Sequence, residues 1–148
     1  MHAKQIHVVI ALFAWVVLLV PGAASAQEYK VVVNASNPVT TVGSAQLSRI
    51  FLKKTTRWPD GSSAMPIDQL WSSEVREEFS TAVHERSAEA IAAYWQRVIF
   101  SGRAVPPVEK ASDAEVLMAV RDDPNAVGYV SPSTPVGDGV KVVTVTGI

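Results

Sequence analysis

The chain has 148 residues, with 13 lysines and arginines against 14 aspartates and glutamates, so its formal net charge at pH 7 is −1. This near-neutral balance excludes the strong basic excess that is typical of nucleic-acid-binding proteins. The sequence contains no cysteine, which excludes disulfides, thiol catalysis and thiolate metal sites, so packing alone must hold the fold together.

The first 26 residues have the pattern of a secretory signal peptide. A basic start is followed by an uncharged apolar run over residues 8–20, which is short for a transmembrane helix. Ala24-Ser25-Ala26 then matches an A-x-A cleavage site. We predict cleavage after Ala26, a periplasmic location, and one mature domain over residues 27–148 that is not an integral membrane protein. The alternative is an uncleaved membrane anchor.

The mature chain alternates between strand and helix patterns. Strands are predicted where β-branched residues cluster, at residues 29–34, 64–70, 126–131 and 140–145. Helices are predicted where apolar residues recur at helical spacing, at residues 44–52, 72–83, 87–100 and 112–121. Helix boundaries are indicated by N-cap or capping-box serines and by one C-terminal glycine: Ser44, Ser72 or Ser73, Ser87, Ser112 and Gly102.

This alternation predicts an α/β fold made of a single three-layer lobe, in which a mixed β-sheet is flanked by helices. The last strand is expected to pair near the first, which makes the sheet mixed. The apolar stripes predict a core that contains Val31, Val33, Ile50, Phe51, Phe79, Trp95, Ile99, Leu117, Val127 and Val142.

Three stretches of the chain resemble a known family. Residues 46–51 read QLSRIF, residues 54–58 read KTTRW, and residues 123–130 read DPNAVGYV. In this order they resemble the phosphate-type substrate-binding proteins of ABC importers, in the type 2 periplasmic-binding-protein superfamily, and more narrowly its PBP-like single-domain relatives. The family fold has two α/β lobes with the ligand between them, and the resemblance implies that this chain provides about one lobe.

The resemblance also implies a ligand site at the start of the second predicted helix. Phosphate-binding members carry Ser-Gly-Thr-Arg there, and backbone N–H groups, hydroxyls and the helix dipole favour an anion. Ser73 and Arg76 match this motif, and with Ser72 they are the expected ligand-binding residues for a small oxyanion such as phosphate. Glu74 and Val75 replace the glycine and threonine, and the Glu74 carboxylate repels an anion. Helix capping by the serines is the alternative.

Two functions remain open at this point. One is an exported solute-binding protein related to the substrate-binding components of phosphate ABC transporters, with an ABC permease or another periplasmic protein as partner, and with a dimer closing the half-cleft. The other is an interaction or scaffold protein that kept the lobe but lost its ligand. We expect no enzyme, cofactor, metal site or nucleic-acid partner, since His84-Glu85 lacks a second histidine and no Gly-x-Ser-x-Gly elbow occurs.

Overall fold

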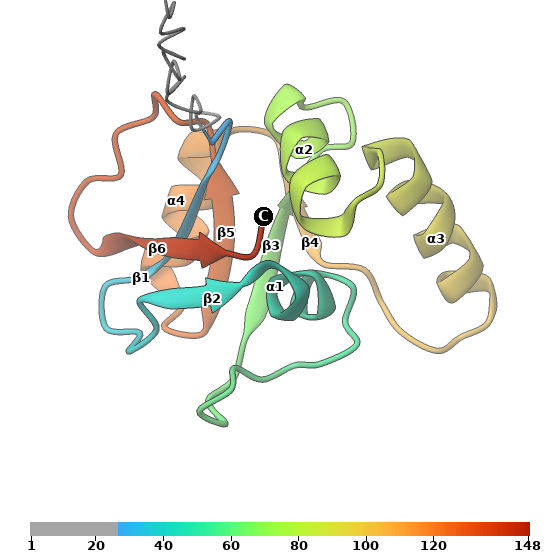
Figure 1. Ribbon diagram of the computed structural model, residues 1–148, viewed down its shortest axis with the longest axis horizontal. Coiled ribbons are helices and arrows are strands. Elements are labelled where there is room, and N and C mark those ends of the chain that lie inside the picture. The colour runs from blue at the N-terminus through green and yellow to red at the C-terminus, as the bar shows by residue number, and fades with distance from the viewer. Residues whose placement is uncertain (1–26) are drawn as a thin grey trace, which may run out of the picture.

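Six strands form a mixed sheet in the computed structural model, which describes residues 27–148 (Figure 1). The strands are β1 (Lys30–Asn34), β2 (Thr41–Gly43), β3 (Met65–Gln69), β4 (Val108–Lys110), β5 (Ala126–Val130) and β6 (Val140–Thr146). Their order across the sheet is β2-β6-β1-β5-β3-β4. The first strand β1 is antiparallel to both β5 and β6, and the other pairs are parallel. The predicted pairing of the last strand with the first is confirmed, and the proposed signal peptide lies outside the described residues.

The helices lie close to where the sequence predicts them. They are α1 (Ser44–Phe51), α2 (Glu74–Phe79), α3 (Ala88–Phe100) and α4 (Asp113–Asp122). One turn of π-helix, η1 (Ser80–His84), continues α2 and is followed by its C-cap residue Glu85, whose φ is 55°. Such π-turns are rare, and nothing in the sequence pattern signals this one. Among residues 27–148, no helix is both long and apolar enough to cross a bilayer.

The strand β1 shows how the three layers arise. Its alternate side chains point to opposite faces, so Val31 and Val33 pack with α1, α2 and η1, whereas Val32 packs with α4. In Figure 1 the helices α1 and α2 accordingly cover one face of the sheet and α4 the other. A Cβ added to Gly128 of β5 would lie 2.6 Å from Val116 Cγ1, so this glycine permits the close approach of α4. The predicted three-layer α/β lobe with a mixed sheet is confirmed.

Two of the ten predicted core residues are wrong. Ile99 is 53% exposed, because α3 lies at the edge of the fold and packs through Ile91 and Trp95 on its other side. Val142 is 49% exposed, because it lies on the α4 face of β6, while α4 packs mainly on β5, β1 and β3. The other eight predicted core residues are buried.

The sequence pattern also missed two strands and misplaced one helix cap. Both β2 and β4 have three residues, which is too short for a periodic signal. The N-cap of α1 is Gly43, and the Ser44 hydroxyl instead donates to the Gly147 carbonyl at 2.8 Å. Ser87 and Ser112 do cap α3 and α4, as predicted.

Candidate functional site

The three residues expected to bind an oxyanion lie where β3 ends and α2 begins. Ser72 is exposed in the turn, and Ser73 is the N-cap of α2 but makes no side-chain capping bond. Its hydroxyl instead donates to Gln69 Oε1 at 2.9 Å. Arg76 is the third residue of α2, within its first turn, and its side chain is only 3% exposed. The arginine is therefore turned into the protein, while Ser72 faces solvent.

Acceptors from the protein itself surround the Arg76 guanidinium. Its Nη2 lies 3.2 Å from Asp68 Oδ2, and its Nη1 lies 2.5 Å from Glu109 Oε1 and donates to the Gln69 carbonyl. The parallel register of β3 and β4 pairs Asp68 with Glu109, which brings the two carboxylates to the same arginine. Of the guanidinium nitrogens, only Nε has no hydrogen-bond partner within residues 27–148.

Tyr129 completes the charged cluster from β5. Its hydroxyl donates to Asp68 Oδ1 and accepts the Gln69 backbone N–H at 3.3 Å. Burial, together with the neighbouring Asp68 charge, raises the pKa of Tyr129 well above its ordinary value, so the phenol stays protonated at neutral pH. Asp68 therefore accepts from three donors: the Tyr129 hydroxyl and the Gln69 backbone N–H at Oδ1, and the Arg76 guanidinium at Oδ2. Its charge is compensated inside the protein by Arg76.

A polar network extends from Gln69 to the start of α4. The Gln69 amide donates to Asp113 Oδ1 at 2.7 Å and to the Tyr129 carbonyl at 3.0 Å. Asp113 Oδ2 accepts from the Ser131 backbone at 3.0 Å and from the Thr134 hydroxyl at 2.6 Å. Burial raises the pKa of Asp113, but these hydrogen bonds from Thr134, Gln69 and Ser131 outweigh it, so the net pKa is lowered. The network ties β3, α4 and β5 together.

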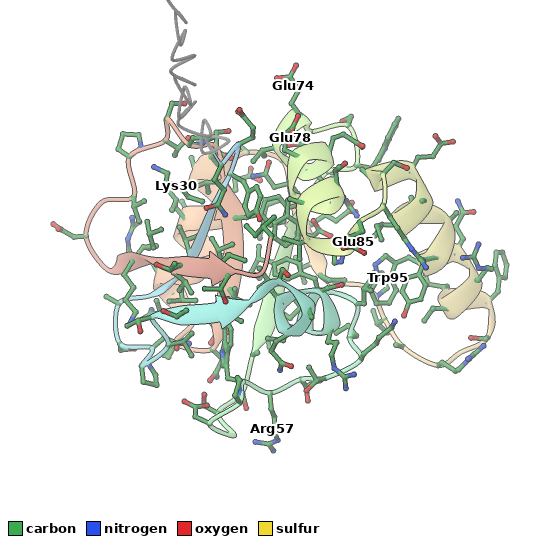
Figure 2. All side chains as sticks on the ribbon, in the orientation of Figure 1. Lys30, Arg57, Glu74, Glu78, Glu85 and Trp95 are labelled. Atoms are coloured by element: carbon green, nitrogen blue, oxygen red, sulfur yellow. The ribbon has the colours of Figure 1, made fainter. Side chains whose placement is uncertain are left out.

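An open depression of about 590 Å³ lies beside the start of α2, and its charge is negative. Four glutamates line it, together with Val75 and a Ser-Pro-Ser turn: Glu28, Glu74, Glu77, Glu78, Ser131, Pro132 and Ser133. Figure 2 shows Glu74 and Glu78 projecting outward from α2. The one lysine or arginine of this helix, Arg76, does not line the depression. An anion that approached the first turn of α2 would meet carboxylates first.

Sequence reasoning missed Asp68, Gln69, Glu109 and Tyr129, which are the actual partners of the expected site. An acid at the end of a predicted strand was the available signal for Asp68. Glu109 had none, because it lies on β4, whose pairing with β3 was not predicted. No group of three or more His, Asp or Glu side chains in the described part of the chain is arranged to hold a metal ion.

His84 belongs to a second polar contact, between η1 and α1. Its Nδ1 shares a hydrogen bond of 2.8 Å with the Ser48 hydroxyl, and its ring lies edge-on to Phe79. Burial, helped by the charges of Arg76, Arg86 and Lys54, lowers the pKa of His84 to about 4. The imidazole is therefore neutral over the physiological pH range and acts as a packing residue.

Comparison with known proteins identifies the fold. No family model matches the chain, and no curated protein matches it in sequence. Solved structures do match. An ABC-type phosphate transport receptor from Vibrio cholerae is 21% identical with a TM-score of 0.62, and the match covers 80% of this chain and 46% of the receptor.

Two further structures give the same result. One is a substrate-binding protein from Clostridium perfringens with bound phosphate, which is assigned to a phosphate ABC transporter. It is 21% identical with a TM-score of 0.62, covering 82% of this chain and 47% of that one. PstS from Borrelia burgdorferi is 12% identical with a TM-score of 0.56, covering 81% and 47%. The chain thus has the fold of phosphate ABC transporter substrate-binding proteins, which supports the resemblance, and spans less than half of their length.

Proposed function

We propose that the chain is an exported, single-lobe protein of the solute-binding type that works beside phosphate-type ABC transport as an interaction module. The fold match to phosphate transport proteins supports the class. Within that class, one observation favours an interaction module over a phosphate receptor. Asp68 and Glu109 already bind the Arg76 guanidinium, so the protein's own carboxylates occupy the place of an anionic ligand.

Charge and exposure at this end of the lobe support the same conclusion. Displacing the buried Asp68 carboxylate from Arg76 would leave a buried charge without its partner, at a cost on the order of several kcal/mol. Trp71, which is 68% exposed, and Leu70, which is 40% exposed, lie between β3 and α2, a few residues before Glu74 of the acidic depression. An exposed tryptophan near a charged rim is typical of a protein-contact surface. The proposed partner is an ABC permease or another periplasmic protein that presents a basic surface.

A pull-down from periplasmic extract tests this function. The tagged chain should retain a partner, and Trp71→Ala should lose it. Phe100→Ala is the matched control, because Phe100 is 91% exposed on α3 and does not belong to the surface around α2. Equal retention by wild type and Trp71→Ala would contradict the proposed surface.

Oxyanion binding at Ser72, Ser73 and Arg76 is the second candidate, and two observations favour it. No side chain of residues 27–148 caps the first turn of α2, so its N–H groups remain available. The Glu109 side chain is 40% exposed and can swing away from Arg76 without being pulled from the core. On this hypothesis, Glu74→Gly should strengthen phosphate binding, and a second copy or a partner would be needed to close the half-cleft.

A further inference from the structure

A basic cavity of about 450 Å³ lies on another part of the molecule, between the C-terminal ends of α1 and α3. Four cations and four other residues line it, and none of them is acidic: Lys53, Lys54, Arg97, Arg103, Leu52, Tyr94, Val98 and Ala104. The volume falls within the range that is usual for small-molecule sites, roughly 300–1,000 Å³. The Tyr94 hydroxyl donates to the Leu52 carbonyl at 3.3 Å, which links the two helices across the cavity.

Within the described residues, the four cations of this basic cavity have no carboxylate partner. Both ion pairs found within residues 27–148 belong to Arg76, at the other site. Of the four, only Arg103 makes a side-chain hydrogen bond there, from its Nε to Ser101 Oγ at 3.0 Å. Each helix C-terminus carries roughly half a negative charge, so the ends of α1 and α3 offset about one of the four positive charges. A large positive excess therefore remains.

Lys53 occupies a backbone position that normally takes glycine. Its φ is 55°, and the hydrogen bonds from Lys53 N to Ile50 O at 3.0 Å and from Lys54 N to Arg49 O at 2.8 Å form a Schellman ending. At the corresponding position after α3 the chain has Gly102, with a φ of 65°. A lysine in the left-handed region is strained, and such strain is found preferentially at functional sites. A lysine at this position, in place of an unstrained glycine, adds a positive charge to the lining of the cavity.

We propose that the basic cavity binds a small anion that carries two or more phosphate groups, such as inorganic pyrophosphate or a phosphorylated organic molecule. Four cations exceed what one phosphate group, with a charge near −2, needs for neutralisation. The Tyr94 ring and the side chains of Leu52 and Val98 supply an apolar wall for a carbon skeleton. The inference goes beyond the proposed function and does not depend on it, because no residue of the α2 region takes part.

Isothermal titration calorimetry of the purified chain with inorganic pyrophosphate tests the cavity. The wild type should show saturable binding that weakens as salt rises, and Arg97→Glu should weaken it by about tenfold or more. Arg49→Glu is the matched control, because this substitution changes the net charge by the same amount. Arg49 is exposed on α1 and does not line the cavity. The control should change the affinity by less than about threefold, as expected for screened charges.

Lys53→Gly separates a ligand-binding role from a structural one. Glycine relieves the left-handed backbone, so the variant should fold at least as stably as the wild type in a thermal melt. It should nevertheless lose several-fold in pyrophosphate affinity, since one cation is gone. If Lys53→Gly binds pyrophosphate as tightly as the wild type, Lys53 serves only to end helix α1, and this result would count against the proposal.

The same phosphate chemistry also occurs in lipid headgroups, and vesicles distinguish the two sources. Exposed Phe100 and Val105 lie near the cavity in sequence, on either side of Arg103. We expect pyrophosphate to bind in solution and to release the chain from any phosphatidylglycerol vesicles that it binds. Binding to those vesicles without any binding or competition by pyrophosphate would overturn the small-anion proposal. Absence of saturable pyrophosphate heat, or equal losses in Arg97→Glu and Arg49→Glu, would overturn it as well.

Discussion

The Arg76 guanidinium lies 3.2 Å from the Asp68 carboxylate, and the two side chains are only 3% and 9% exposed. Removing one member of a buried ion pair leaves the other charge uncompensated. Arg76→Met should therefore lower the free energy of unfolding by about 3–5 kcal/mol, measured by urea denaturation.

A double variant provides the control for this pair. Asp68→Asn/Arg76→Met removes both charges, so it should be less destabilised than Arg76→Met alone. An Arg76→Met protein as stable as the wild type would show that the pair does not hold β3 against α2.

His84 should make the stability depend on pH. Its pKa is about 4 in the folded chain against an ordinary value of 6.5, so the folded state disfavours the protonated ring. Keeping the ring neutral contributes about 3 kcal/mol to the free energy of unfolding. This contribution is fully present above about pH 6.5 and is lost as the pH falls towards 4. Urea denaturation at a series of pH values measures this dependence.

His84→Asn is the matched control for the pH series. Asparagine can keep a hydrogen bond to Ser48 at the position of Nδ1, but it has no proton to gain in this range. The variant should show a flatter profile between about pH 6.5 and pH 5, where unpaired carboxylates contribute little. The same slope in both proteins would mean that another group causes the pH dependence.

Two neighbouring apolar residues of α3 should respond in opposite ways. Trp95 is 5% exposed and packs with Ile91 and Leu52, so Trp95→Ala should cost about 3–5 kcal/mol. Ile99→Ala should change stability by less than about 0.5 kcal/mol, because Ile99 is 53% exposed. Thermal denaturation compares the two, and equal losses would contradict the packing of α3 through its Trp95 side, which Figure 2 shows facing the body of the protein.

Gly128 should not tolerate a side chain. The Cβ of Gly128→Ala would lie 2.6 Å from Val116 Cγ1, so α4 must shift, at a cost of about 1–3 kcal/mol. Gly43→Ala is the control, since a Cβ there has no heavy atom within 4 Å and its φ of −72° suits alanine. Equal melting temperatures for the two variants would mean that α4 packs less closely than the structure indicates.

The sequence predicted the elements with strong periodicity and missed those defined only by pairing. Three valines in β1 and the apolar stripe of α3 carry their own signal, so both elements were predicted to within a residue or two. The strand β4 forms because residues 108–110 pair in parallel with Ile67–Gln69 of β3. No local sequence pattern reveals this pairing.

The candidate site shows the same limit. The resemblance predicted a site at Ser73 and Arg76 at the start of the second helix, and in the structure both residues lie at the start of α2. Arg76 is compensated by Asp68 and Glu109, which lie 8 residues before it and 33 residues after it, and the pairing of β3 with β4 brings these two carboxylates together beside it. Charge compensation between distant residues cannot be derived from the spacing of a motif.

Phosphate calorimetry at the α2 site tests the central claim most directly. The comparison uses Arg97→Glu and Glu74→Gly/Arg97→Glu, so that the basic cavity is weakened to the same extent in both proteins and cannot account for a difference between them. We predict no saturable phosphate binding by either protein, because Asp68 and Glu109 hold Arg76. Saturable binding by Arg97→Glu that becomes tighter when Glu74 is replaced would contradict the account and would identify α2 as a phosphate site.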